Sequence, residues 1–298
     1  MKSTVALLGA SGFIGRAIHA ELETCGFSVV PFYSDRAASF ENKSISSVYV
    51  DFHNTSRYRE LIGLLRPDII ISTPWVTSLP DYRTSPLNLQ FKNSTISLAK
   101  IALEFETSHF ICFGSSAEYG DNNLACDSST SPINPLDLYS QSKYETYLEL
   151  SNLFRYSTTR FNWLRVFQPF GEYQDSNRLI PYLVSELSAG RTPVLREPNR
   201  VSDWVSSKDI ADATIFSIKN NLPEILDIGS TIGTHNWELV SILMKILEID
   251  SPRIETSISY SESRGLVASK LSPIFQAGWQ PSGKLHESLS VLFGFSDR

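Results

Sequence analysis

The sequence predicts an α/β fold in which a doubly wound parallel sheet is joined to a smaller C-terminal domain. Short apolar runs alternate with helical patterns along most of the chain, as expected of parallel strands connected by helices. The chain has 298 residues, of which 42% are hydrophobic and 19% are charged. It is therefore long enough to bury the core of one large domain and to build a second, smaller one.

The first strand, turn and helix form the most specific part of this pattern. The apolar run Val5–Leu8 is typical of a buried parallel strand, and a helical pattern follows from Phe13 to Thr24, with Gly26 as its stop signal. Between them lies a glycine-rich loop, Gly9–Gly15. Its glycines let the backbone turn tightly and approach a pyrophosphate at the helix N-terminus, so the loop predicts a dinucleotide site.

Further strands and helices follow in order. Apolar runs predict strands at residues 29–32, 48–52, 67–73, 109–113 and 225–229, and one more strand before residue 165. Helical patterns carry Asn88 and Asn93, begin at residues 178 and 207, and run over residues 235–247. This order predicts a large dinucleotide-binding domain at residues 1–167 plus about 203–230. The smaller domain is expected at residues 168–202 and 231–298.

Two short segments carry the candidate catalytic residues. Tyr139 and Lys143 are four positions apart, so on a helix they share one face and point into the same cleft. A neighbouring ammonium stabilises the phenolate form of a tyrosine, which lowers its pKa and makes the pair a usable proton donor or acceptor. A hydroxyl from Ser115 or Ser116, at the end of the strand at 109–113, can hydrogen-bond the same substrate oxygen.

The glycine loop, the serines and the Tyr-x-x-x-Lys spacing together resemble the extended short-chain dehydrogenase/reductase family, in its NAD-dependent epimerase/dehydratase branch, which modifies nucleotide-linked sugars. The resemblance covers nearly the whole chain, as far as Gly278-Trp279-Gln280-Pro281. It implies a Rossmann-type sheet for the dinucleotide and a smaller C-terminal substrate-binding domain for a nucleotide-diphosphate sugar. Counting back from Tyr119-Gly120, as the family's motif is counted, assigns the catalytic hydroxyl to Ser115 rather than Ser116.

The resemblance also assigns the cofactor contacts. Asp51 is expected to contact the adenine amino group and Lys143 the nicotinamide ribose, while Pro169 ends a strand beside the nicotinamide. Asn93 matches an asparagine that relatives place behind the active site. The full set of expected cofactor contacts within the sheet, loops and helices is Gly9, Ser11, Gly12, Phe13, Ile14, Arg36, Asp51, Phe52, Thr73, Asn93, Tyr139, Lys143 and Pro169.

The preferred dinucleotide depends on the residue that ends the second strand, where an acid favours a free ribose 2′-hydroxyl. By the family's spacing this residue is Tyr33, which is followed by Ser34 and Arg36. A cation next to a hydroxyl suits a 2′-phosphate, so NADP(H) is favoured. NAD(H) stays open, because Asp35 can turn inward and reverse the inference.

Substrate contacts are expected from both domains. Ser116 adjoins the catalytic hydroxyl, and Arg178 begins a helix of the smaller domain, where an arginine can pair with a diphosphate. Relatives usually carry Arg-Asp and an aromatic residue where this chain has Ser202-Asp203-Trp204. Arg200 is therefore expected to serve the same diphosphate from a shifted place.

The two residues after Ser115 limit the reaction. Sugar dehydratases of the family carry Asp-Glu there, and epimerase-reductases acting at C3 and C5 carry a cysteine where this chain has Ala117, which cannot transfer a proton. The leading hypothesis is an NADP(H)-dependent reductase of a nucleotide-linked 4-keto-6-deoxy sugar, as used for surface polysaccharides. The alternatives are an NAD-dependent nucleotide-sugar 4-epimerase and a non-catalytic NADP(H) sensor.

Glu118 is expected at the surface, and Trp75, where relatives have small residues, is expected to serve packing.

Charge, cysteine and histidine content argue against several other classes of protein. A net charge of −6 argues against a general nucleic-acid or membrane-surface binder. The cysteines Cys25, Cys112 and Cys126 form no CxxC pair, and the histidines lack metal-site spacing, so neither a disulfide framework nor a metal site is expected. A first strand without a leader and the lack of a long apolar stretch predict a cytoplasmic protein. The oligomeric state stays open; the resemblance suggests a homodimer through the helices around Asn93 and Tyr139, since relatives are often dimers.

Overall fold

Parallel pairing of the apolar runs builds one large sheet in the computed structural model, which describes residues 2–33, 48–77, 81–121, 125–250, 255–256 and 265–294. Its strands are β1 (Thr4–Leu8), β2 (Ser28–Tyr33), β3 (Val48–Tyr49), β4 (Ile69–Ser72), β5 (His109–Ser115), β7 (Arg160–Val166) and β11 (Ile225–Ile228). All seven are parallel, in the spatial order β11-β7-β5-β4-β1-β2-β3. The order reverses between β1 and β4, where doubly wound sheets bind their ligands. The predicted fold class is confirmed.

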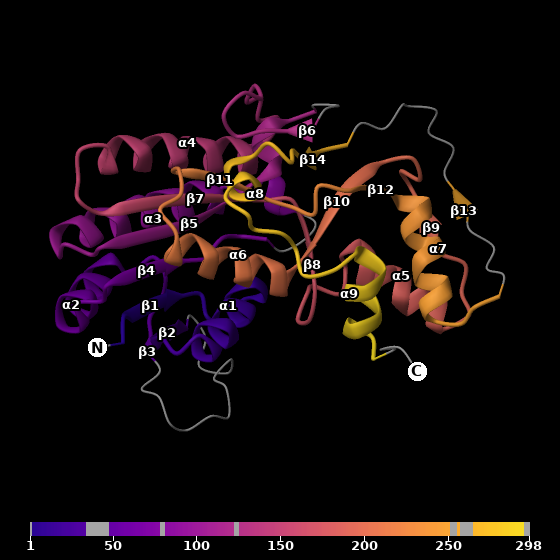
Figure 1. The fold of residues 1–298 in the computed structure, drawn as a ribbon, viewed down its shortest axis with the longest axis horizontal. Helices are drawn as coiled ribbons and strands as arrows, with labels where there is room; N and C mark the ends of the chain where they lie inside the picture. Colours follow the sequence, from indigo (N-terminus) through magenta and orange to yellow (C-terminus); the bar gives the residue numbers. More distant parts are fainter. Residues whose placement is uncertain are drawn as a thin grey trace.

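Helices cover both faces of this sheet (Figure 1). One face carries α1 (Phe13–Thr24) and α6 (Ser207–Lys219), which pack together over residues such as Leu7 and Ile71. The other face carries α2 (Thr55–Leu65), α3 (Leu87–Glu104) and α4 (Leu138–Phe154), which bury the alternate residues Leu8 and Ile70. A strand buried on both faces reads as a continuous apolar run, which is why the sequence reveals these strands so clearly.

The smaller domain lies at the other end of the molecule (Figure 1). Its sheet holds β8 (Gln168–Phe170), β10 (Val201–Ser206) and β12 (Gly233–His235), with β10 parallel to β8 and antiparallel to β12. The helices α5 (Leu179–Ser188), α7 (Asn236–Ile246) and α9 (Leu285–Leu292) pack around its separate core. Short elements complete the described chain: β6 (Ala125–Cys126), β9 (Val194–Leu195), β13 (Glu255–Thr256), β14 (Val267–Ala268), α8 (Pro273–Gln276), η2 (Asp81–Arg83) and η3 (Ser116–Tyr119).

Several boundaries differ from the predicted ones. The predicted strand at 48–52 ends as β3 at Tyr49, because the chain turns at Asp51, whose carbonyl accepts the N–H of Asn54 at 2.9 Å. Residues 201–206 form β10 of the smaller sheet, so the chain returns to the large sheet only at α6. Conversely, Ile274 and Trp279 from the C-terminal segment pack into the core of the large sheet.

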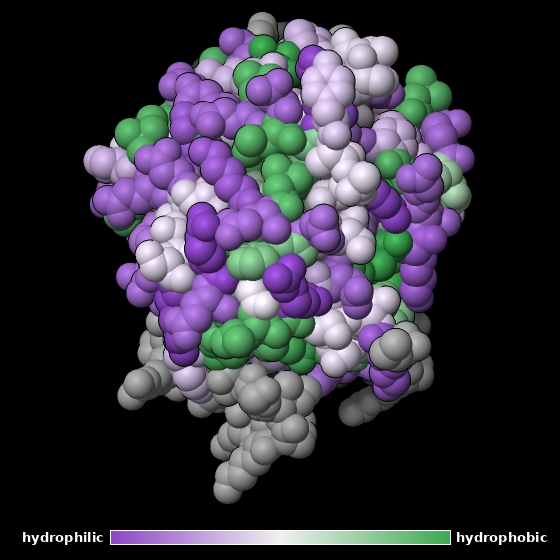
Figure 2. Space-filling model, turned by 90° about the vertical axis from the view of Figure 1, so that its left-hand side faces the viewer, coloured by the Kyte–Doolittle hydropathy of each residue, from purple (hydrophilic) through white to green (hydrophobic). Residues whose placement is uncertain are grey.

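The surface at the α2 end of the molecule is mostly polar. Figure 2 shows hydrophilic residues over much of this face, with apolar side chains in smaller groups between them. Among the described residues, no helix combines the length and the apolar character needed to cross a membrane.

Candidate active site

The glycine loop packs tightly at the point where the strand order reverses. Gly9 has φ +75°, and a Cβ there would collide with the side chain of Thr73. The N–H groups of Gly9 and Ala10 both donate to the carbonyl of Phe32, at 3.1 and 3.2 Å. At Gly15 a Cβ would strike the carbonyl of Gly9, so glycine here permits α1 to lie directly against the loop.

The N-terminus of α1 faces the crevice without a protein cap. Its N-cap is Gly12 in an extended conformation, no side chain caps the first turn, and that turn holds no acidic residue. Free N–H groups and the helix dipole at such an end favour an anion. The residues present therefore fit the pyrophosphate of a dinucleotide, and the predicted contacts Phe13, Ile14 and Thr73 line the adjoining cleft.

Ser115, Tyr139 and Lys143 all open onto this cleft, whose cavity volume is about 260 Å³. Ser115 is the last residue of β5, and the other two lie on the first turns of α4. Asp137 is the N-cap of α4 and accepts the N–H of Ser140 at 2.8 Å, which fixes the helical turn that carries Tyr139. The expected convergence of these side chains at one site is present.

The Tyr139 phenol is half-buried. Burial raises its pKa above the ordinary value of a tyrosine, while the Ser115 hydrogen bond and the charge of Arg83 act in the opposite direction. The ring of Tyr82 packs edge-on against it, with ring centroids 5.1 Å apart. The pKa of Tyr139 is thus raised, and the prediction that a neighbouring ammonium lowers it is wrong.

Lys143 is almost completely buried, with 5% of its surface exposed. Its Nζ donates to the carbonyl of Phe113 at 2.7 Å and lies 3.7 Å from the ring centroid of Trp75. Burial lowers the pKa of Lys143 to about 7, although Cys112 and Glu118 favour its charged form. Nζ lies 6.0 Å from the centroid of the Tyr139 ring.

Glu118 overturns the expectation of a surface position, because its side chain is fully buried. One carboxylate oxygen accepts the backbone N–H of Ser115 at 2.9 Å, and the other pairs with Nε of Arg165 at 2.7 Å. Arg165 is itself 1% exposed. The Ser-x-x-Glu spacing of Ser115 and Glu118 is that of a capping box, the sequence signal that points to this role.

The predicted substrate residues line the same cleft, together with Pro169, which lies within β8 rather than at a strand end. Ser116 adjoins Ser115. Arg178 is the N-cap of α5 and donates to the carbonyl of Thr77 at 2.8 Å. Arg200 forms an exposed ion pair with Glu197 at 3.2 Å. Both arginines therefore bring positive charge to the small-domain side of the cleft.

Some predicted cofactor contacts do not line the cleft. Asn93 is exposed on α3, so its predicted place behind the active site is not observed, and Asn88 is the buried asparagine of that helix. Asp51 is exposed and Phe52 is buried in the core beside α3. Arg36 lies outside the described residues.

The second strand ends at Tyr33, the position that the sequence analysis assigned to its carboxyl end. Tyr33 is 3% exposed and packs on Tyr49, with ring centroids 5.8 Å apart. Arg16 lies close enough for its charge to oppose the rise that burial causes in the pKa of Tyr33. The Arg16 Nε donates to the carbonyl of Ser11 at 2.8 Å, within the glycine loop.

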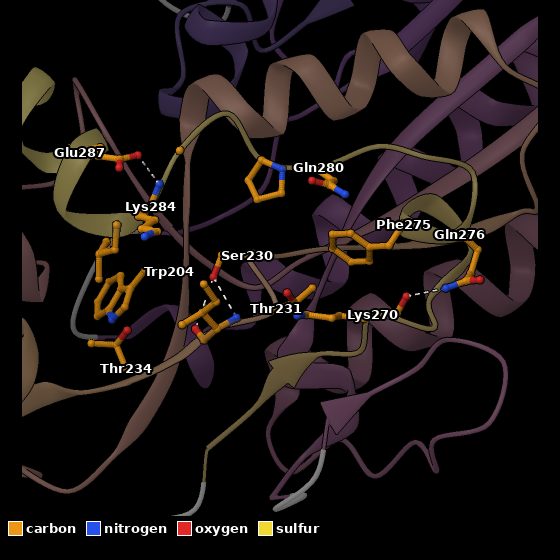
Figure 3. A pocket seen from close by; sticks show the side chains of 14 residues that line it. Trp204, Ser230, Thr231, Thr234, Lys270, Phe275, Gln276, Gln280, Lys284 and Glu287 are labelled. Atoms are coloured by element: carbon orange, nitrogen blue, oxygen red, sulfur yellow. Dashed lines mark hydrogen bonds between the residues drawn. The ribbon is translucent and has the colours of Figure 1, made fainter.

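A second cavity of about 550 Å³ lies away from these groups (Figure 3). Trp204 and Thr234 lie at one end, Lys270 and Gln276 at the other, and Ser230 between them. It is larger than the catalytic cleft, but none of the candidate catalytic residues lines it. Within the described ranges, no group of three or more His, Cys, Asp or Glu side chains is arranged to hold a metal ion. Chemistry rather than size therefore identifies the smaller cleft as the candidate active site.

Comparison with known proteins gives matches over nearly the whole chain. Residues 5–229 match the profile described as the NAD dependent epimerase/dehydratase family. The UDP-glucose 4-epimerase of Lactobacillus helveticus is 21% identical over 96% of this chain and 93% of its own, and that of Lacticaseibacillus casei is 23% identical over 94% and 92%. The structure of the Thermus thermophilus UDP-glucose 4-epimerase in complex with NAD superposes with a TM-score of 0.86, at 18% identity over 98% of both chains.

Proposed function

The chain belongs to the NAD dependent epimerase/dehydratase family, and from this premise we propose that it is an NAD-dependent nucleotide-sugar 4-epimerase. The observation that carries the proposal is the meeting of Ser115, Tyr139 and Lys143 in one cleft beside an uncapped glycine-loop helix. Similarity to UDP-glucose 4-epimerases over more than nine-tenths of both chains supports the choice of reaction.

The proposed reaction divides the work between the cofactor and the side chains. NAD, when bound, supplies the hydride acceptor and donor for C4 of the sugar. The chain's own residues handle the hydroxyl at C4: Tyr139 takes up its proton as the carbonyl forms and returns a proton when the carbonyl is reduced from the opposite face. Ser115 hydrogen-bonds the reacting oxygen, and Lys143 supplies positive charge close to Tyr139.

The smaller domain is proposed to hold the nucleotide diphosphate. Arg178 and Arg200 line the cleft on this side. Guanidinium groups match the oxygens of a diphosphate in geometry and charge. Because the sugar must then turn over within the site to expose both faces of C4, contacts to the diphosphate rather than to the sugar are expected to anchor the substrate.

A second candidate is an NADP(H)-dependent reductase of a nucleotide-linked 4-keto sugar. One observation favours it: β2 ends on the phenol of Tyr33, beside Arg16, where a carboxylate would favour NAD. NADPH, if bound, would supply the hydride for C4, and Tyr139 would donate one proton to the oxygen. The raised pKa of Tyr139 suits that single donation.

One experiment separates the two candidates. The purified protein is denatured and the released nicotinamide nucleotide is identified; the native protein is then incubated with UDP-glucose, and with 4-keto nucleotide sugars plus NADPH or NADH. The 4-epimerase predicts retained NAD and formation of the C4 epimer without net oxidation. Oxidation of NADPH by a 4-keto sugar would instead establish the reductase. If the wild-type protein gave neither reaction with any of these sugars, both candidates would be rejected.

A further inference from the structure

Trp75 has a role beyond packing. We propose that Trp75, fixed by Asn88, is a positioning residue that holds the ammonium of Lys143 against the end of β5 and keeps water from it. The functional meaning of this arrangement rests on the proposed function, in which Lys143 supplies charge to the proton carrier. The arrangement itself does not, because it is built from contacts within the protein.

The Trp75 ring directly contacts the ammonium of Lys143. Nζ of Lys143 lies 3.7 Å from the centroid of the Trp75 ring, well inside the range of a cation–π contact. On its other side Nζ donates to the carbonyl of Phe113 at 2.7 Å. With 5% of Lys143 exposed, the ring replaces part of the water shell that an ammonium otherwise needs.

A hydrogen bond to Asn88 fixes the orientation of the Trp75 ring. Nε1 of Trp75 donates to Oδ1 of Asn88 at 2.8 Å. The Asn88 amide nitrogen donates to the carbonyls of Tyr82 at 2.6 Å and Ser85 at 2.9 Å, which sets the orientation of the amide. Asn88 is fully buried, so each of its polar groups is used inside the protein. The indole is thereby pinned in one orientation over Lys143.

The same amide connects to the other catalytic side chain on α4. Asn88 donates to the carbonyl of Tyr82. The ring of Tyr82 packs edge-on against the ring of Tyr139, with centroids 5.1 Å apart. Asn88 thus fixes one aromatic neighbour of Lys143 and the backbone of one neighbour of Tyr139. A single buried side chain on α3 thus contacts a neighbour of each of these two residues of α4.

The charge balance explains why an aromatic ring is needed here. The titratable groups that face Lys143 are Cys112 from β5, Glu118 from η3 and Tyr139 from its own helix. Burial favours the neutral amine, and it outweighs the help from Cys112 and Glu118. The negative face of the indole opposes this effect without adding a charge that would compete for the proton of Tyr139.

The test compares Trp75→Phe with Trp75→Leu, because both lose the hydrogen bond to Asn88 and only Phe keeps a ring face. The Lys143 pKa is measured by NMR titration of lysines labelled at Cε, with the Lys143 signal assigned through Lys143→Arg. Lys143 is expected to titrate about one pH unit lower in Trp75→Leu than in Trp75→Phe. Equal values, or a higher value in the leucine variant, would overturn the proposal.

The readout separates this proposal from the proposed function. If wild type turns over nucleotide sugars but the two variants titrate alike, the role of Trp75 is wrong and the function stands. If the variants differ as expected but no nucleotide sugar reacts, the positioning role stands and the function is wrong. Where turnover is present, the alkaline limb of the kcat profile is expected to move with the Lys143 pKa. Thermal melting of each variant confirms that the protein measured is folded.

Discussion

Ser115 and Lys143 line the same cleft, yet the protein supports them by different physical means. Behind Ser115 lies a buried ion pair, in which the Glu118 carboxylate holds the Ser115 N–H and Arg165 balances its charge. Behind Lys143 lie neutral groups, the ring of Trp75 and the amide of Asn88. Removing one member of a buried ion pair lowers the unfolding free energy strongly, because it leaves a buried charge without its partner. Changing a neutral ring or amide lowers it less. The comparison predicts that substitutions change stability most on the Ser115 side, and that substitutions on the other side change the pKa of Lys143.

The largest effect, a loss of turnover, is expected from substitution of Tyr139, which lies in the same cleft as Ser115 and Lys143. Tyr139→Phe removes the proton carrier but keeps the ring that packs on Tyr82. Turnover should fall by about 10³-fold or more, since general acid–base catalysis supplies an effect of this order. Dinucleotide binding, measured by calorimetry, should change little. A variant that retains near wild-type turnover would remove Tyr139 from the account.

The buried ion pair is tested by Glu118→Gln, which keeps an acceptor for the Ser115 N–H but deprives the buried Arg165 of the carboxylate it contacts directly. Unfolding free energy should fall by about 3–5 kcal/mol, the usual effect of breaking a buried pair. Chemical denaturation measures it. The matched control is Glu104→Gln, which breaks the exposed pair between α2 and α3 and should have little effect. Equal effects of the two substitutions would contradict the difference between buried and exposed pairs.

Stability on the Ser115 side should also depend on pH through Asp227, whose buried carboxylate interacts electrostatically with Arg165. Asp227 accepts hydrogen bonds from Tyr119 at 2.8 Å and Ser272 at 2.9 Å. Burial raises the pKa of Asp227 to about 6, from 3.8 when unfolded. The folded protein therefore binds the proton more tightly, so this contribution to stability is present at low pH and is lost as pH rises from about 4 to 6.

Asp227→Asn removes this titration while leaving the other buried groups in place, including His109, whose pKa burial lowers to about 4. The unfolding free energy of wild type relative to the variant should fall by about 2.4 kcal/mol between pH 4 and pH 7. Denaturant unfolding at several pH values measures it. A difference independent of pH would show that Asp227 keeps an ordinary pKa.

The smallest loss of stability is expected from substitution of Asp137, the N-cap of α4. Asp137→Ala removes the N-cap bond to Ser140 and the contact with Arg83, which is partly exposed. Stability should fall by about 1 kcal/mol, as for other N-caps. Asp137→Asn keeps a capping oxygen and should restore most of it. If Asn behaves like Ala, the contact with Arg83 rather than the cap stabilises this turn.

The two sides also differ in how far the sequence predicts them. The large sheet, the glycine loop and the shared face of Tyr139 and Lys143 follow from local patterns, so they were predictable. Ser115 as a strand end follows from the same reasoning. These features depend on residues close together in the chain, where periodicity and spacing carry the information.

The supports depend on contacts between distant segments. Arg165 meets Glu118 across 47 positions, and a lone glutamate in a turn is usually solvated. Trp75, in the loop after β4, meets Lys143 of α4 and is bonded to Asn88 of α3. The packing of α3 determines that Asn88 rather than Asn93 is its inward residue. Neither contact leaves a periodic signal in the sequence, apart from the Ser-x-x-Glu spacing at Ser115.

The most direct test of the central claim follows the hydrogen at C4. The wild-type protein is incubated with a nucleotide sugar deuterated at C4, and the product is analysed by NMR and mass spectrometry. The account predicts that turnover inverts C4 with the deuterium retained there, and that Tyr139→Phe stops this conversion. Turnover that releases the C4 deuterium to water would contradict hydride transfer at this centre.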